Sequence, residues 1–148
     1  MTGVQTCALP ISALERTARV IGERPVTTDV EDAPLVKYDS VLLQQALVNL
    51  LENAAKHTPG GTPIAISARE VAEGVEVVVA DRGPGLARGK EADVWGELRR
   101  GRLGLTIAKA IVVAHGGRIW AENRDGGGAA FHFTLPMDGI PPATEPEP

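Results

Sequence analysis

Residues 41–57 restrict the fold of this chain more than any other segment. Ten of these seventeen residues are apolar, which is typical of a helix that packs against other elements. Asp39 or Ser40 can cap such a helix at its start. The turn-forming residues 58–61 end it, so the pattern predicts one long helix that runs to about His57.

The polar residues of this helix follow a regular spacing. Asn49, Glu52, Asn53 and Lys56 occupy positions i, i+3, i+4 and i+7, and Gln45 extends the series by one turn. At about 100° per residue, these side chains lie on one face. A solvated face is the simplest interpretation, but asparagine is a poor helix former. Two amides, a carboxylate and a lysine also suit a magnesium phosphate site, because Mg²⁺ prefers oxygen ligands and lysine attracts phosphate.

A carboxylate and two glycines follow the second of two predicted strands. Ile64–Arg69 and Val75–Asp81 alternate as strands do, and Asp81 ends the second one. The next residues form an ordinary turn, or else Gly83 and Gly85 let the backbone approach a flat ligand that donates a hydrogen bond to Asp81. The glycine spacing matches neither a dinucleotide-binding fingerprint nor a Walker A loop.

A glycine-rich stretch leads into a second apolar helix, predicted over residues 105–115 and ended by Gly116-Gly117. Gly101 and Gly104 precede this helix, and its N-terminal N–H groups can bind phosphate. The alternative is an ordinary basic loop. The positive charge next to this stretch comes from three arginines: Arg99, Arg100 and Arg102.

The remaining elements complete an α/β pattern. Residues 13–23 are predicted as the end of a helix, 25–30 as a short strand, and 118–123 and 129–135 as a hairpin. Strands mixed with two or three helices favour one sheet that is covered by helices on one face.

Composition limits the classes of function. Lysine plus arginine number 15 against 19 acidic residues, so the net charge of −4 argues against a nucleic-acid surface. The apolar runs are too short to cross a bilayer. A single cysteine excludes an internal disulfide framework and a multi-cysteine metal site.

Both ends of the chain differ in character from the middle. Residues 1–12 lack periodicity and resemble a translated sequencing-library adapter, so they are expected to be a cloning or assembly scar; an ordinary disordered N-terminus is the alternative. Residues 137–148 are rich in proline and acidic side chains, which predicts a disordered tail.

Three motifs in this order resemble those of histidine kinase catalytic domains in the GHKL superfamily. Asn49–His57 resembles the N box, Asp81–Gly85 the G1 box, and Leu103–Leu105 with its helix the G2 box. The sequence around these motifs is most similar to that of the potassium-sensing, Kdp-type sensor kinases. The resemblance covers residues 13–135 and implies the Bergerat fold. That fold is a two-layer α/β sandwich with a mixed sheet on one side and about three helices on the other.

The resemblance also implies ATP and Mg²⁺ as ligands and assigns a role to each motif residue. Asn53 would be the principal Mg²⁺ ligand, with Asn49 beside it on phosphate or metal. Lys56 would contact a phosphate and Glu52 would be a supporting partner, so Asn49, Glu52 and Lys56 are the candidate catalytic residues. The other candidate nucleotide-binding residues are His57 near the ribose or phosphates, Asp81 on the adenine amino group, Gly83 and Gly85 around the ring, and Gly101, Gly104 and Leu105 along the triphosphate.

The domain limits follow from the same comparison. Residues 13–24 are expected to end a preceding helical dimerisation region or linker, and 25–136 to form the ATP-binding domain. In the family, a histidine of the dimerisation domain accepts the phosphate, the whole protein is a homodimer, and a response regulator is the further partner. The fragment would then lie on the cytoplasmic side of a membrane-anchored sensor, with no contact to membrane or nucleic acid.

The sequence departs from the family in the lid that covers ATP. Only eighteen residues separate Gly85 from Gly104, and Arg102 stands where a second glycine is expected. Three hypotheses follow: a kinase domain that transfers phosphate, a nucleotide-binding module without turnover, and another GHKL member such as an anti-sigma serine kinase or a gyrase-type ATPase. The gyrase type usually has a carboxylate where Asn49 stands, so Asn49 favours transfer over hydrolysis.

Overall fold

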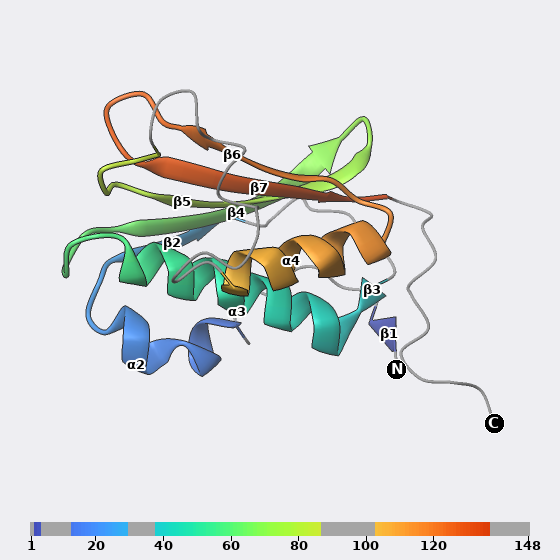
Figure 1. Cartoon of the computed structure of the whole chain (residues 1–148), viewed down its shortest axis with the longest axis horizontal. Helices are drawn as coiled ribbons and strands as arrows, with labels where there is room; N and C mark the ends of the chain where they lie inside the picture. Colours follow the sequence, from blue (N-terminus) through green and yellow to red (C-terminus); the bar gives the residue numbers. More distant parts are fainter. Residues whose placement is uncertain (1, 4–12, 30–37, 87–102, 137–148) are drawn as a thin grey trace.

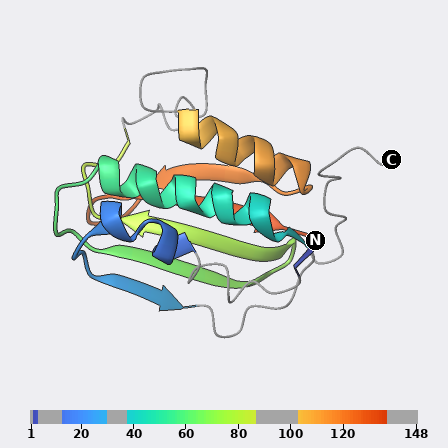
Figure 2. The same ribbon diagram turned by 90° about the horizontal axis from the view of Figure 1, so that it is seen from below.

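The computed structural model describes residues 2–3, 13–29, 38–86 and 103–136. A five-stranded sheet has the order β2-β4-β5-β7-β6, with β2 parallel to β4 and the other neighbours antiparallel. Three helices cover one face of this sheet (Figures 1 and 2). The predicted two-layer α/β sandwich is therefore confirmed. The strands are β2 (Val26–Asp29), β4 (Ile64–Val71), β5 (Gly74–Asp81), β6 (Ile119–Asn123) and β7 (Ala129–Leu135), and the helices are α2 (Ala18–Ile21), α3 (Ser40–Lys56) and α4 (Leu103–Ala114).

Helix α3 begins and ends close to its predicted limits. Asp39 is the N-cap, and its Oδ1 accepts hydrogen bonds from the backbone N–H groups of Val41 and Leu42, both at 3.0 Å. The backbone N–H of Asp39 donates to Nε2 of His115, and Nδ1 of the same ring donates to the carbonyl of Ile111. This buried histidine therefore ties the start of α3 to the end of α4, with both ring nitrogens occupied.

The core lies between the helices and the sheet. Alternate residues of β5 point toward the helices, so Val75, Val77 and Val79 are buried as the alternation predicted. Phe131 and Phe133 of β7 add the only phenylalanines of the sequence to this layer. Helix α3 contributes the largest set of fully buried side chains: Leu43, Ala46, Leu47, Leu50, Leu51 and Ala54.

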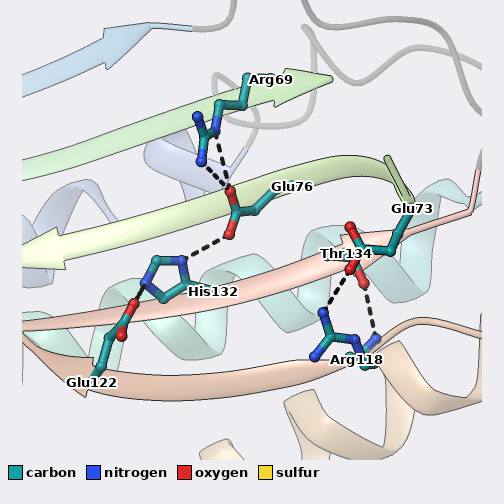
Figure 3. A network of polar contacts seen from close by, with 7 residues as sticks. All are labelled: Arg69, Glu73, Glu76, Arg118, Glu122, His132 and Thr134. Carbon is teal, nitrogen blue, oxygen red and sulfur yellow. Dashed lines mark hydrogen bonds and ion pairs between the residues drawn. The ribbon is translucent and has the colours of Figure 1, made fainter. Parts of the chain in front are cut away.

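The opposite face of the sheet carries a row of charged side chains (Figure 3). Glu76 of β5 accepts hydrogen bonds from Arg69 of β4 and lies 3.0 Å from Nδ1 of His132 on β7. Nε2 of His132 lies 2.8 Å from Glu122 of β6, at an angle unfavourable for a hydrogen bond. Trp120 stacks on the same imidazole, with ring centroids 4.9 Å apart. These contacts cross four strands and satisfy a glutamate that is almost fully buried.

The segment before β2 packs on α3. Residues 13–16 form one helical turn, and α2 follows after an interruption at Thr17, whose hydroxyl donates to the carbonyl of Ala13. The Arg24 guanidinium donates to the carbonyls of Ala55 and Thr58 at the C-terminal end of α3. Cations are favourable at that end of a helix, so Arg24 secures the last turn of α3.

A short strand pair lies beside the start of α3. The strands β1 (Thr2–Gly3) and β3 (Tyr38–Asp39) pair in antiparallel fashion. Within residues 1–12, the segment expected to be a scar, the structure describes only Thr2 and Gly3. The expected tail at residues 137–148 lies outside the described residues. Within the described ranges, no helix is long and apolar enough to span a membrane.

Candidate functional site

The polar face of α3 lines a pocket of about 280 Å³. Asn49, Glu52, Asn53 and Lys56 form one wall, as their spacing predicted. The opposite walls come from the start of α4, through Gly104 and Leu105, and from Val20 of α2. Val20 was not anticipated, because an isolated exposed valine carries no motif signal.

A second pocket, of about 110 Å³, adjoins the first at Asn53. It brings Asn53 and His57, at the end of α3, together with Asp81 and Gly85, which lie more than twenty residues further along the sequence. The N-box face and the G1 segment therefore meet in space, as the site hypothesis required. Four further lining residues were missed because they belong to a turn and a core strand: Pro84, Leu86, Ala129 and Phe131.

Asn53, the residue common to both pockets, carries an unpaired polar atom. Its side chain is 9% exposed, and its Oδ1 is buried without a hydrogen-bond partner in the described structure. An unsatisfied buried acceptor costs about 1–3 kcal/mol, so such atoms are rare unless a ligand uses them. An amide oxygen is an acceptor for a donor group and a suitable ligand for a hard cation.

Asn49 differs from Asn53 because its amide oxygen and its amide nitrogen each already have a hydrogen-bond partner. Its Oδ1 accepts a hydrogen bond of 2.7 Å from Gln45, and its Nδ2 donates one of 3.0 Å to the carbonyl of Gly104. The second of these bonds joins α3 to the first turn of α4. Asn49 thus connects two walls of the larger pocket, a role that its sequence position alone did not indicate.

Asp81 is held rigidly at the end of β5. Its side chain is 4% exposed, and its Oδ1 accepts hydrogen bonds from the backbone N–H groups of Gly83 at 2.9 Å and Ala129 at 3.1 Å. Neither bond uses Oδ2, which remains for a ligand in the smaller pocket. The Arg124 guanidinium donates to the backbone carbonyl of Asp81. Burial, followed by the positive charge of Arg82, lowers the pKa of Arg124, while Asp81 raises it.

The glycines of the motifs differ in what an added side chain would meet. A Cβ at Gly83 would lie 2.5 Å from Cγ2 of Thr58, so its absence lets the G1 segment pack on the end of α3. Gly85 has φ +82°, a conformation that side chains disfavour, and a Cβ there would meet Asn123. A Cβ at Gly104 would make only ordinary contact with Asn49. Gly101 and the loop expected to form the lid lie outside the described residues.

The remaining ionisable groups do not form a competing site. Within the described ranges, no three histidine, cysteine, aspartate or glutamate side chains are grouped to hold a metal ion. His115 is 3% exposed with both ring nitrogens occupied, and His132 lies on the opposite face of the sheet. Among the described residues, the two adjoining pockets are therefore the candidate functional site.

The molecule is a two-layer α/β sandwich with two adjoining pockets, each lined by both polar and apolar residues. Residues 38–139 match the family described as histidine kinase-, DNA gyrase B- and HSP90-like ATPases. The chain belongs to this ATPase family.

The curated relatives are sensor kinases. Over 122 residues the chain is 41% identical to the adaptive-response sensory kinase SasA of Thermosynechococcus vestitus, covering 75% of this chain and 32% of SasA. It is 40% identical over 124 residues to the sensor protein KdpD of Escherichia coli, covering 78% of this chain and 14% of KdpD. The predicted likeness to Kdp-type kinases is confirmed, and the chain spans about a third or less of these relatives.

Solved structures of histidine kinases share the fold. A mycobacterial sensor histidine kinase, MprB, superposes with a TM-score of 0.80 at 28% identity, covering 95% of this chain and 99% of that one. Full-length ShkA in complex with AMPPNP gives 0.81 at 26% identity, covering 93% and 31%. ThkA in complex with the response regulator TrrA gives 0.78 at 25% identity, covering 93% and 41%.

Proposed function

We propose that this chain is the ATP-binding catalytic domain of a two-component sensor histidine kinase. It would hold Mg²⁺-ATP and present the γ-phosphate to a histidine on a dimerisation domain. The observation that carries the proposal is the unpaired, buried Oδ1 of Asn53 at the junction of the two pockets. Asn53 would hold Mg²⁺ through this oxygen, and the bound cation would supply positive charge to the triphosphate.

The larger pocket suits the triphosphate and its metal. Asn53 would be the principal Mg²⁺ ligand, and Asn49 keeps a second lone pair on Oδ1 for a supporting contact. When bound, Mg²⁺ neutralises charge on the phosphate oxygens. Lys56 adds a positive charge on the same wall, and Glu52 supplies an acceptor beside it. Gly104 and Leu105 border the phosphates at the N-terminal end of α4, where backbone N–H groups and the helix dipole favour anions.

The smaller pocket suits adenine. Oδ2 of Asp81 would accept a hydrogen bond from the exocyclic amino group, and Phe131 and Leu86 would supply apolar contacts to the ring. Gly85 would leave space for the base at the pocket entrance, with Gly83 keeping the segment in place. His57, which also lines this pocket, would lie near the ribose or phosphates.

The reaction transfers the γ-phosphoryl group from an oxygen of ATP to a nitrogen of the acceptor histidine. An imidazole nitrogen of the acceptor attacks the γ-phosphorus, a P–N bond forms, and the bond from phosphorus to the β–γ bridging oxygen breaks to release ADP. The domain contributes mainly positioning and charge neutralisation. Acceptor and domain belong to the same homodimeric protein, and a response regulator then receives the phosphate, in line with the sensor kinase relatives and the ThkA–TrrA complex. In such a protein the domain would lie on the cytoplasmic side of a membrane-anchored sensor.

One observation favours transfer over hydrolysis of the gyrase type. Hydrolysis requires a general base that activates water, and a carboxamide has no basic lone pair for this purpose. Both ends of the Asn49 amide are already hydrogen-bonded to Gln45 and Gly104. Two alternatives remain. A nucleotide-binding module without turnover differs from the kinase only in the transfer step, and an anti-sigma-type serine kinase differs in the residue that accepts the phosphate.

The experiment is a calorimetric titration with ADP and ATP, with and without Mg²⁺, of the wild type and of Asn53→Ala. Asn53→Ala should weaken Mg²⁺-dependent binding by about tenfold or more, because a ligand to the cation is lost, and leave metal-free binding within about twofold. Gln44→Ala, on the same helix but outside the pocket lining, is the matched control. Equal losses with and without Mg²⁺ would place Asn53 on the nucleotide or in the fold instead.

Transfer is tested separately with labelled ATP and a purified dimerisation domain from a sensor kinase. Acid-labile label on the acceptor would support the kinase, and binding without label would support the module that lacks turnover. Absence of nucleotide binding by the wild type would refute the proposal.

A further inference from the structure

A chain of three hydrogen bonds crosses the helix layer and ends at the larger pocket. Nη2 of Arg16 donates to Oε1 of Gln45 at 3.2 Å, and Nε2 of Gln45 donates to Oδ1 of Asn49 at 2.7 Å. Nδ2 of Asn49 then donates to the carbonyl of Gly104 at 3.0 Å. This series of hydrogen bonds connects the helical turn at residues 13–16 to α3 and to the start of α4.

The two ends of this chain determine its direction. An arginine guanidinium can only donate hydrogen bonds, and a backbone carbonyl can only accept them. Each amide between them must therefore accept on the Arg16 side and donate on the Gly104 side. The orientation of the Asn49 amide, which is otherwise ambiguous between oxygen and nitrogen, follows from its partners.

We propose that Gln45 is a positioning residue for the nucleotide site. It holds the Asn49 amide with its nitrogen toward α4, and so sets how closely the first turn of α4 approaches the polar face of α3. This inference rests on the proposed function, because those two elements form facing walls of the proposed phosphate pocket.

Gln45 acts through Asn49 and not through direct contact with a ligand. It is not among the residues that line either described pocket, whereas Asn49 and Gly104 both line the larger one. The hydrogen bond of 3.0 Å between Nδ2 of Asn49 and the carbonyl of Gly104 is the direct polar contact between the two facing walls at this point. A turned or displaced Asn49 amide therefore moves the start of α4.

The neighbouring Gln44 provides a matched control. It lies on the same helix with similar partial burial, and its Oε1 accepts a hydrogen bond of 3.0 Å from Nη1 of the same arginine. Within the described part of the chain, Gln44 makes no hydrogen bond to Asn49. A glutamine-to-glutamate substitution thus adds the same charge at either position, but only the substitution at position 45 interrupts the series of hydrogen bonds.

The test uses Gln45→Glu and Gln44→Glu. The glutamate at position 45 keeps an acceptor for Arg16 but presents an oxygen where Nε2 donated to Asn49. Asn49 must then turn its nitrogen toward the glutamate, which places its oxygen against the Gly104 carbonyl. Loss of one partly buried hydrogen bond and the new oxygen–oxygen contact should weaken Mg²⁺-ADP binding by about tenfold, whereas Gln44→Glu should change it by less than about twofold.

Two further measurements separate positioning from general stability. The thermal midpoint of Gln45→Glu should lie no more than about 8 °C below that of Gln44→Glu, because one hydrogen bond of the folded protein is lost, and both variants should remain folded at the temperature of the binding assay. Amide hydrogen exchange in the first turn of α4, measured without nucleotide, should accelerate in Gln45→Glu only. In an Asn49→Ala background, Gln45→Glu should cause no additional loss of affinity, since its effect passes through Asn49.

Equal losses of affinity in the two glutamate variants would refute the inference, because charge alone would then explain them. Additive losses in the Asn49→Ala background would also refute it, since Gln45 would act by another route. If the wild type fails to bind Mg²⁺-ADP, the proposed function fails and the positioning role fails with it. Unchanged exchange in α4 of Gln45→Glu would refute the hydrogen-bond chain even if the wild type binds nucleotide.

Discussion

Replacing Asp81 by asparagine should remove the preference for adenine without unfolding the domain. Adenine presents an amino donor at its six position, and guanine presents a carbonyl acceptor there. The buried carboxylate of Asp81 can accept from the first and repels the second. A buried polar group matched to one base rejects the other by a factor on the order of 10⁴, so the wild type should bind ATP far more tightly than GTP.

The size of the effect follows from the two oxygens of Asp81. Oδ1 accepts from the N–H groups of Gly83 and Ala129, and an asparagine oxygen can accept both bonds as neutral ones. A neutral acceptor weakens each bond by about 1 kcal/mol, so the domain should lose at most about 2 kcal/mol of stability. At Oδ2 the amide places a donor opposite the adenine amino group. Loss of a charge-assisted bond and an unpaired donor together cost about 3–4 kcal/mol, or roughly 10²- to 10³-fold in ATP affinity.

The assay is competition binding of ATP and GTP at equal Mg²⁺, with thermal unfolding of each variant. Glu76→Gln is the matched control, since Glu76 lies on the same strand, is 7% exposed and faces the opposite side of the sheet (Figure 3). This control removes a charge that Arg69 and His132 contact, so it should lower stability while leaving the ATP-to-GTP ratio unchanged. Equal affinity of the wild type for both nucleotides would refute the placement of adenine. Full discrimination by Asp81→Asn would do the same.

Three other predictions concern the fold and the chemistry. Gly117→Ala should lower the thermal midpoint by more than about 5 °C, because the added Cβ would overlap the carbonyl oxygen of Thr134. In the control Gly60→Ala the added Cβ would meet no atom within 4 Å, so the midpoint should change by less than about 2 °C. Comparable midpoints for the two variants would contradict the packing of the turn at Gly117 on β7. Removal of residues 1–12 should leave the midpoint unchanged within error, since only the two-residue β1–β3 pairing is lost among described contacts, and a loss of several degrees would show that this segment packs on the domain. The chain incubated alone with labelled ATP should acquire no acid-labile phosphate, and label on any of its own histidines would overturn the assignment of an external acceptor.

Local patterns in the sequence were sufficient for most of the elements. The cap at Asp39 and the apolar spacing after it predicted α3 to within a residue at each end. Strands β4 and β5 and the hairpin of β6 and β7 follow from alternation and glycine-rich turns. Smaller differences arose at glycines: Gly74 was expected in a turn, but it begins β5 with φ +137°, and the turn precedes it. Such signals depend on neighbours within a few residues, which is why they are readable without the fold.

One wall of the larger pocket could also be predicted from the local sequence. A helix turns by a constant angle per residue, so the four spaced polar residues from Asn49 to Lys56 had to share one face once the helix was assigned. The sequence therefore determined the composition of one wall. It also supplied the motif order by which the family resemblance arose, and the match over residues 38–139 confirmed that resemblance.

Only the tertiary structure decided how that wall is used. The meeting of Asn53 with Asp81 depends on β5 lying beneath the end of α3, which no local pattern encodes. The two asparagines look equivalent in sequence, yet the Asn49 amide is hydrogen-bonded to Gln45 and Gly104 while Oδ1 of Asn53 is left unpaired. Hydrogen-bond satisfaction is a property of all the groups that surround an atom, including those more than fifty residues away along the chain. The sequence thus named the polar groups of the site, and the packing of distant segments determined which of them remain available to a ligand.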